Sequence, residues 1–327
     1  MKLVTYIAEG IGPGSTVQVG ALLGSEYILD FERATTGKAR DAFANAHSGY
    51  LPGYLSWFDL DNPLLQQASE VYQKLAVSEN SIDVTPGEKP IIHRSRVRMV
   101  APVPRPGKLI CIGLNYRDHA AESNMKIPDK PVVFSKFTTS VIAPGEPVVL
   151  PAMSRQVDYE AELAVVIGRR ARNVKAERAF EYVLGYTIVN DISARDFQFA
   201  DGQWQRGKSC DTFAPMGPSI VTTSEVPDPQ KLSIKLHLNG TTMQDSNTDQ
   251  LIFGVPQLIE FLSETITLEP GDVIATGTPA GVGFARKPPV FLKSGDVMQV
   301  EIEKLGTLTS PVIAAEKTAG KHAHSNL

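Results

Sequence analysis

The sequence predicts a β-rich α+β fold, and three observations support this prediction. The chain of 327 residues contains 26 glycines and 23 prolines, a share slightly above average that indicates many turns. Beyond residue 107, short apolar stretches of strand length alternate with turn residues. Asn239 and Gly240 separate two alternating stretches, and this pair predicts a β-hairpin because both residues tolerate a positive φ.

The length favours more than one domain. Residues 101–107 contain three prolines and can be neither a central strand nor a helix interior, because each proline removes a backbone donor. We therefore predict a small N-terminal α/β domain over residues 1–103, a main domain over residues 104–314 and a polar tail over residues 315–327.

The elements follow from local pattern. In the N-terminal domain we expect strands at residues 3–7 and 17–23 and a helix at 62–75. In the main domain, strands are expected at 109–112, 132–134, 163–167, 187–189, 234–238, 273–275 and 297–302. Helices are expected at 176–184 and 255–265; in the second, Leu258, Ile259 and Leu262 lie on one face.

Composition excludes several classes of protein. Hydrophobic residues make up 42% of the chain and charged residues 21%, which are ordinary globular values. The net charge is −4 and no long run of Lys or Arg occurs, so we expect neither nucleic acid nor a membrane as partner. Residues 1–8 do not resemble a signal peptide, and Cys111 and Cys210 form no CxxC motif, so we predict a cytoplasmic protein without disulfides or a zinc-thiolate site.

Residues 202–209 match the P-loop pattern GxxxxGK[ST]. A P-loop requires a buried strand before it and a helix after it, so that backbone amides point at a phosphate. Here polar residues precede the pattern, and Pro215 and Pro218 follow it. We therefore reject nucleotide binding.

Three carboxylates predict a metal site. Glu160 and Glu162 open an apolar strand, and because side chains alternate they project from one face. They could equally line the solvent face of an edge strand. Asp191 ends another apolar stretch and could join them. Three oxygen ligands without a cysteine indicate a hard cation, Mg²⁺ or Mn²⁺.

Further residues are candidates for acid-base chemistry and for binding an anion. His119 and Glu122 lie three residues apart, a spacing that suits a general base and is also common in exposed pairs. Residues 276–283 are rich in glycine and could offer amides to a carboxylate or enolate oxygen, or could be a long turn. Lys208 and Arg195 could neutralise an anionic substrate or be surface charges.

Together these motifs resemble the fumarylacetoacetate hydrolase family, which includes acylpyruvate hydrolases. The resemblance covers about residues 108–312 and rests on motifs in the order of the family: residues 113–122, 134–136, 158–163, 190–196, 207–209 and 276–283. It implies a mixed β-sandwich roll, usually a homodimer, with the N-terminal residues as the extra domain of a longer subgroup.

The resemblance also implies roles for individual residues. It implies that Glu160, Glu162 and Asp191 bind Mg²⁺ or Mn²⁺, with Ca²⁺ as a substitute in a crystal. It implies that His119 and Glu122 activate water and that Lys208 contacts the substrate. The remaining residues implied to bind the carboxylate of a 2-oxo acid are Arg195, Gln198, Thr278 and Gly277. Residues 123–129 and 199–205 are candidates for a lid.

The function implied is a metal-dependent hydrolase that cleaves a C–C bond in a 2,4-dioxo acid, of the acylpyruvate or fumarylpyruvate type used in aromatic catabolism, through a metal-stabilised enolate. Decarboxylation of an oxaloacetate-type acid, enol-keto isomerisation including that of a 2-hydroxy-diene-dioate, and hydration use the same groups and remain alternatives. A non-catalytic binding protein with this fold is an alternative of another class.

Overall fold

The computed structural model describes residues 1–8, 17–35, 53–76, 90–200 and 202–316. Its strands are β1 Lys2–Ala8, β2 Gln18–Leu23, β3 Tyr27–Asp30, β4 Ile91–His93, β5 Val97–Met99, β6 Leu109–Gly113, β7 Val132–Lys136, β8 Val141–Ile142, β9 Val148–Leu150, β10 Val157–Asp158, β11 Ala161–Ile167, β12 Val183–Asn190, β13 Ser193–Ala194, β14 Ala214–Thr222, β15 Ser233–Leu238, β16 Thr241–Asn247, β17 Val273–Ala275, β18 Val297–Ile302 and β19 Gly306–Ala314.

The helices of the described residues are mostly short. The α-helices are α1 Phe31–Ala34, α3 Pro63–Ala76, α4 Arg117–Glu122, α5 Arg195–Gln198, α6 Gln205–Lys208 and α7 Val255–Ser263. The 3-10 helices are η1 Gly53–Phe58, η2 Arg94–Arg96, η3 Thr138–Ser140, η4 Ala176–Tyr182, η5 Thr248–Gln250 and η6 Gly283–Ala285. No helix of the described ranges is long and apolar enough to cross a membrane.

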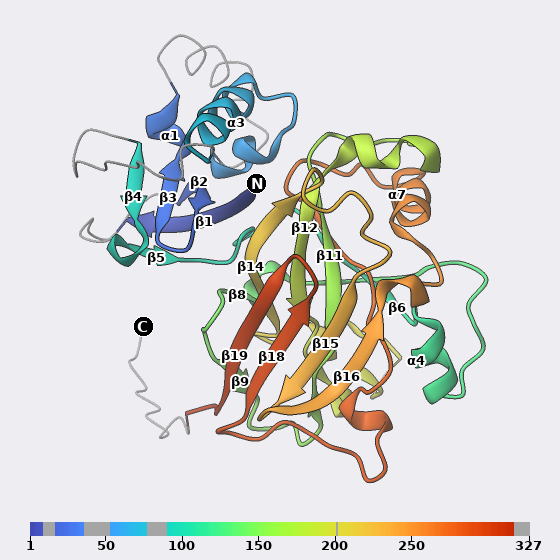
Figure 1. Cartoon of the computed structure of the whole chain (residues 1–327). Coiled ribbons are helices and arrows are strands. Elements are labelled where there is room, and N and C mark those ends of the chain that lie inside the picture. Colours follow the sequence, from blue (N-terminus) through green and yellow to red (C-terminus); the bar gives the residue numbers. More distant parts are fainter. Residues whose placement is uncertain (9–16, 36–52, 77–89, 201, 317–327) are drawn as a thin grey trace, which may run out of the picture.

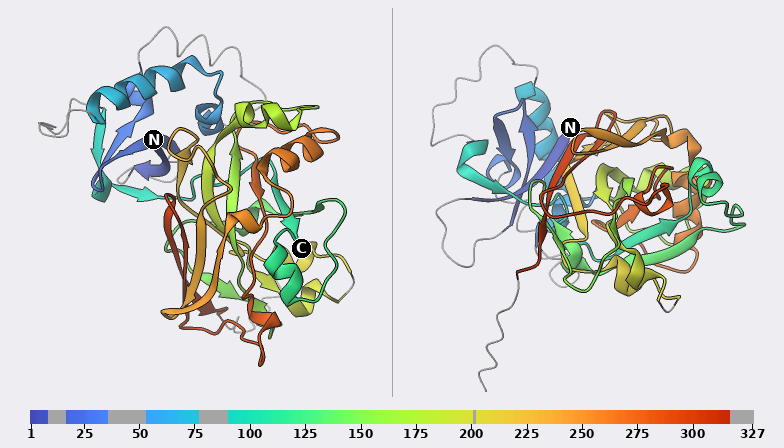
Figure 2. Two further views of the ribbon diagram at one scale, coloured as in Figure 1. Left: turned by 45° about the vertical axis from the view of Figure 1, so that its right-hand side comes forward. Right: turned by 90° about the horizontal axis from the view of Figure 1, so that it is seen from below.

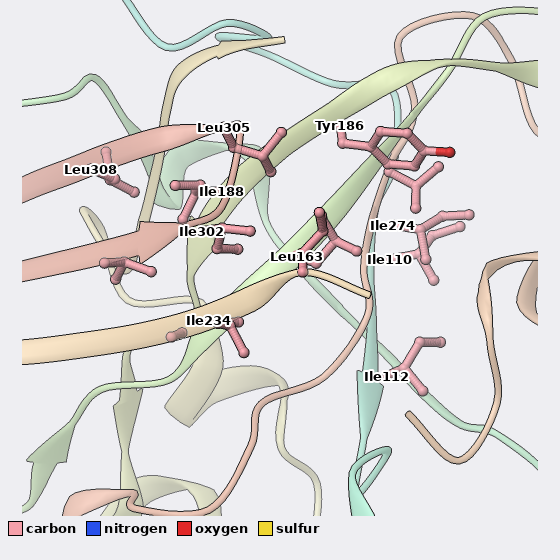
Figure 3. Packing of buried hydrophobic residues seen from close by; sticks show 14 of the residues in the cluster. Ile110, Ile112, Leu163, Tyr186, Ile188, Ile234, Ile274, Ile302, Leu305 and Leu308 are labelled. Atoms are coloured by element: carbon pink, nitrogen blue, oxygen red, sulfur yellow. The ribbon is translucent and has the colours of Figure 1, made fainter. Parts of the chain in front are cut away.

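Two sheets form the body of the protein. The larger has the order β4-β3-β2-β1-β14-β12-β11-β17-β6-β7, and the smaller has the order β16-β15-β18-β19-β9. The smaller sheet lies across β11 and β12 (Figure 1). Figure 3 shows the core between them, where Leu163 and Ile188 of the larger sheet lie near Ile234 and Ile302 of the smaller one. Pairing is both parallel and antiparallel, so the predicted β-rich α+β fold with a mixed sandwich is confirmed.

The N-terminal strands continue the larger sheet. β1 pairs antiparallel with β14, with Leu3 opposite Ile220, and so links the first residues to the main body. Strands β1 to β4 with α1 and α3 form a lobe at one side of the molecule (Figure 1, Figure 2). The domain boundary at residue 103 stays a prediction, and of the polar tail only residues 315–316 lie within the described ranges.

Most elements lie where the sequence predicts them, including the hairpin at Asn239 and Gly240, which joins β15 to β16 with positive φ at both residues. The predicted helix at residues 176–184 is wrong at its C-terminal end. A 3-10 helix ends at Tyr182, and Val183 already pairs with Ile167 as the first residue of β12. Pairing with a central strand outweighs the weak helical pattern there, because a β-branched residue packs well in a sheet.

Candidate active site

Three buried carboxylates form an acidic cluster where β11 and β12 lie side by side. Glu160 precedes β11, Glu162 lies in it and Asp191 follows β12. Antiparallel pairing brings these ends together, and the Asp191 amide donates to the Glu160 carbonyl at 2.9 Å. One carboxylate oxygen of each residue lies within 4.8 Å of the other two. All three are buried, so the alternative of a solvent face does not hold.

Three buried cations surround the acidic cluster. Lys208 Nζ donates to Glu160 at 2.7 Å and to Asp191 at 2.9 Å. Lys136 Nζ, at the end of β7, donates to the other oxygen of Asp191 at 2.6 Å. Arg195 Nη2 donates to Glu160 at 2.7 Å. These ion pairs offset the cost of burying the carboxylates.

Asp158 holds Arg195 in place. Its Oδ2 accepts from Arg195 Nε at 3.1 Å and from Nη2 at 2.8 Å, a fork that fixes the guanidinium. The same side chain accepts from the amides of Gly283 and Phe284 at 2.7 and 3.0 Å. Arg195 Nη1 donates to Gln198 at 2.9 Å. Asp158 therefore connects the Arg195 guanidinium to the loop after β17.

The two glutamates of the cluster differ in charge environment. Burial would raise the pKa of Glu160, but Lys208 and Arg195 outweigh it and hold this pKa at about 2. Burial, Asp191 and Glu160 raise the pKa of Glu162 well above its usual range. Among the residues that the structure describes, no Lys or Arg forms an ion pair with Glu162. The three oxygen ligands fit a divalent hard cation, which would offset the repulsion that Asp191 and Glu160 exert on the Glu162 carboxylate.

His119 and Glu122 form a pair on α4. His119 Nδ1 lies 3.4 Å from Glu122 Oε2, and the pair is exposed on one side only, because His119 is buried and Glu122 is exposed. The Glu122 carboxylate accepts from the Gly281 amide at 3.0 and 3.1 Å. Because Nδ1 faces Glu122, Nε2 is the ring nitrogen that remains for a substrate.

The loop over residues 276–283 does offer amides to carboxylates, but to those of the protein itself. Gly277 N donates to Glu162 at 3.0 Å, and Gly281 N donates to Glu122. Gly277 has φ +105° and its Cα faces Asn115, where an added Cβ would lie 2.8 Å from the Asn115 Cβ, so a glycine is required. The amide of Gly277 thus positions a carboxylate of the cluster, and its contact with a substrate stays a prediction.

A cavity of about 100 Å³ opens onto the site. The predicted site residues that line it are His119, Glu160, Glu162, Arg195, Gln198, Lys208 and Thr278. The others lie next to lining residues, since Asp191 contacts Lys208, Glu122 contacts His119 and Gly277 contacts Glu162. The structure therefore gathers all ten predicted residues around one small charged cavity.

Sequence reasoning missed the roles of several residues here. Lys136 and Asp158 lie within motifs noted above, yet no role follows from the motif letters alone. The burial of Lys136 is known only from the fold, so no sequence signal marks its role. Trp204 lies inside the P-loop pattern and lines the cavity. The lysine of that pattern, Lys208, donates to the carboxylates of Glu160 and Asp191.

Known proteins resemble this chain in both sequence and structure. The mitochondrial oxaloacetate tautomerase of Rattus norvegicus is 49% identical over 225 residues, which are 68% of this chain and 72% of that protein. The fumarylacetoacetate hydrolase from Exiguobacterium antarcticum has a TM-score of 0.73 at 34% identity, covering 96% of this chain and 99% of that one. The 5-carboxymethyl-2-hydroxymuconate delta-isomerase from Mycobacterium smegmatis has a TM-score of 0.69 at 34% identity, covering 96% and 100%.

Two of these names, a tautomerase and an isomerase, are consistent with the predicted enol-keto alternatives, and hydrolysis of a C–C bond stays a prediction. The rat relative is named mitochondrial, and the cytoplasmic location of this chain stays a prediction. The sequence model described as "Fumarylacetoacetate (FAA) hydrolase C-terminal" matches residues 108–313, which contain the acidic cluster, the His119–Glu122 pair and the loop over residues 276–283. The chain therefore belongs to the fumarylacetoacetate hydrolase family.

Proposed function

We propose that this protein catalyses the enol-keto tautomerisation of a 2-oxo dicarboxylic acid of the oxaloacetate type. The observation that carries this proposal is the 49% identity to an oxaloacetate tautomerase across the region that contains every residue of the acidic cluster. The cavity supports it, because its volume of about 100 Å³ lies well below the ~300–1,000 Å³ of pockets for drug-sized ligands. A small anion suits such a cavity.

The residues around the cavity have distinct tasks. His119 Nε2 would take the proton from the enol oxygen, and a proton would be returned to the carbon at the far end of the C=C bond. The C–O bond then becomes C=O and the C=C bond becomes a single bond, without loss of atoms. Glu122 would hold the imidazole through Nδ1. Lys208 and Arg195 would attract the substrate carboxylates.

Glu160, Glu162 and Asp191 would hold Mg²⁺ or Mn²⁺. The chemistry that such a cation supplies when bound is Lewis-acid polarisation of the oxygens of a 2-oxo acid. We include in the proposal that the activity requires this cation, that the substrate is a 2-oxo acid and that the protein has no nucleic-acid partner.

The test follows the decay of enol oxaloacetate by its ultraviolet absorbance, with Mg²⁺ and with a chelator. We expect a metal-dependent acceleration that falls by about 10²–10⁴-fold in His119→Gln, the range for a general acid-base residue. His237→Gln is a matched control, since this histidine lies on β15 and contacts Thr242 at 3.0 Å. Equal rates with and without the wild-type protein would refute the proposal and favour a non-catalytic binding protein.

Hydrolysis of a C–C bond in an acylpyruvate is a second candidate. The observation that favours it is the carboxylate-fixed imidazole, because Glu122 is itself anchored by the Gly281 amide and the pair suits activation of a water. Loss of acetylpyruvate with release of pyruvate would support hydrolysis. Release of pyruvate from oxaloacetate would instead support decarboxylation.

A further inference from the structure

Two aromatic side chains separate the cavity from a second, larger hollow. The inner cavity is the one that contains Glu160 and His119. The outer groove, of about 730 Å³, is lined by residues of β7 and of the segment before α6, among them Phe137 and Gln203. Of the described residues, Phe134 and Trp204 are the two that line both. They form a wall between the spaces.

The wall is fixed by packing. The rings of Phe134 and Trp204 meet edge to face with centroids 5.3 Å apart. The indole also packs directly on the backbone of Gly113, where an added Cβ would lie 2.5 Å from it. The Trp204 carbonyl accepts from the Lys208 amide at 3.0 Å and so starts α6. Neither ring can move aside without breaking these contacts.

The wall stands close to the charged groups. Lys208 Nζ lies 5.1 Å from the centroid of the Phe134 ring while it donates to Glu160 and Asp191. A 2-oxo acid whose carboxylate binds beside Lys208 therefore has room for only a short chain before it meets the aromatic rings. The outer groove continues beyond them, with polar side chains and with the apolar side chains of Val133, Ile266 and the 60% exposed Phe137.

We propose that Trp204 determines substrate specificity by limiting the length of the acid, with Phe134 completing the wall. The proposal rests on the proposed function in one respect, that the ligand is a 2-oxo acid. Trimming the indole joins the inner cavity to the outer groove, and longer 2-oxo acids then bind with their chains in the groove.

The test is isothermal titration calorimetry with Mg²⁺ and straight-chain 2-oxo acids from pyruvate to 2-oxooctanoate. We expect wild-type affinity to fall along the series. In Trp204→Ala, the affinity for 2-oxooctanoate relative to pyruvate rises at least tenfold, as expected for methylenes that gain an apolar site. If the alanine variant does not fold, Trp204→Leu should show the same rise in relative affinity. Trp204→Phe keeps an aromatic ring in the wall and should keep the wild-type affinities along the series.

Phe199→Ala is the matched control. Phe199 also lines the inner cavity, but its ring pairs with Phe284 at 6.0 Å and does not line the outer groove. The inference would be overturned if the affinity for 2-oxooctanoate relative to pyruvate stayed at the wild-type value in both Trp204→Ala and Trp204→Leu. It would also be overturned if this relative affinity rose as much in Phe199→Ala as in Trp204→Ala. The decay of enol oxaloacetate is measured in parallel. If the wild type does not accelerate this decay but the Trp204 variants gain relative affinity for long acids, the proposed function alone is refuted. If the wild type accelerates the decay but the Trp204 variants keep the wild-type relative affinities, this inference alone is refuted.

Discussion

Replacing Glu162 and Glu160 separately with glutamine should affect the metal-free protein in opposite ways, although the two side chains lie two residues apart. Glu160 accepts from Lys208 and Arg195, each at 2.7 Å, whereas Glu162 accepts from the Gly277 amide and faces Asp191 and Glu160. Lys208 and Arg195 compensate the charge of Glu160, whereas no Lys or Arg among the described residues forms an ion pair with Glu162.

The magnitudes follow from these contacts. Removing one partner of a buried ion pair costs about 3–5 kcal/mol, so Glu160→Gln should lower the free energy of unfolding by about that amount. At roughly 2 °C per kcal/mol for a chain of this size, Tm falls by about 6–10 °C. Burial, Asp191 and Glu160 raise the pKa of Glu162 well above its usual range and so favour its neutral form when no metal is bound. Glu162→Gln replaces this carboxyl group with a neutral group of the same size, so Tm without metal should stay the same or rise.

Thermal unfolding followed by circular dichroism, with a chelator and with excess Mg²⁺ or Mn²⁺, measures both effects. A cation at about 100 times its Kd stabilises the wild type by about 2.7 kcal/mol, or about 5 °C. Both variants should lose most of this metal-induced rise because each lacks one ligand. If Glu162→Gln is as destabilised as Glu160→Gln in chelator, or keeps the full metal-induced rise, the charge assignment is refuted.

Three further predictions concern the surroundings of the site and the assembly. Lys136→Met removes the donor to Asp191 and should lower unfolding stability by about 3–5 kcal/mol in chelator; an unchanged Tm would contradict this. Asp158→Asn loosens Arg195 and should lower kcat/KM for oxaloacetate at least tenfold by the loss of charge-assisted hydrogen bonds, about 1.5–3 kcal/mol each, and wild-type kinetics would exclude this positioning role. Light scattering should give a homodimer, twice the 35.5 kDa of one chain, and a monomer mass would reject it.

Local pattern predicted the acidic cluster but left open whether its glutamates face solvent, and it did not predict their counter-charges. Glu160 and Glu162 share a face because strand side chains alternate, and Asp191 could be placed because it ends an apolar stretch. Which cation reaches which carboxylate depends on sheet order. Lys136 lies 55 residues from Asp191 in sequence, and its role follows only from folding of the chain.

The other differences between prediction and structure also arise from contacts between segments that are distant in the sequence. The helix at residues 176–184 was wrong where Val183 finds a partner in Ile167, a contact made across a sheet. Trp204 carries no local signal, because its place between two hollows depends on Gly113 and Phe134 from other segments. Non-local packing therefore sets both the counter-charges and the shape of the cavity.

A crystal structure of the protein grown with Mn²⁺, with anomalous scattering recorded, tests the central claim most directly. We predict one strong anomalous peak within bonding distance of a carboxylate oxygen from each of Glu160, Glu162 and Asp191. A well-ordered structure at saturating Mn²⁺ with a peak elsewhere, or with Lys208 still bridging Glu160 and Asp191 and no peak between the three carboxylates, would contradict it.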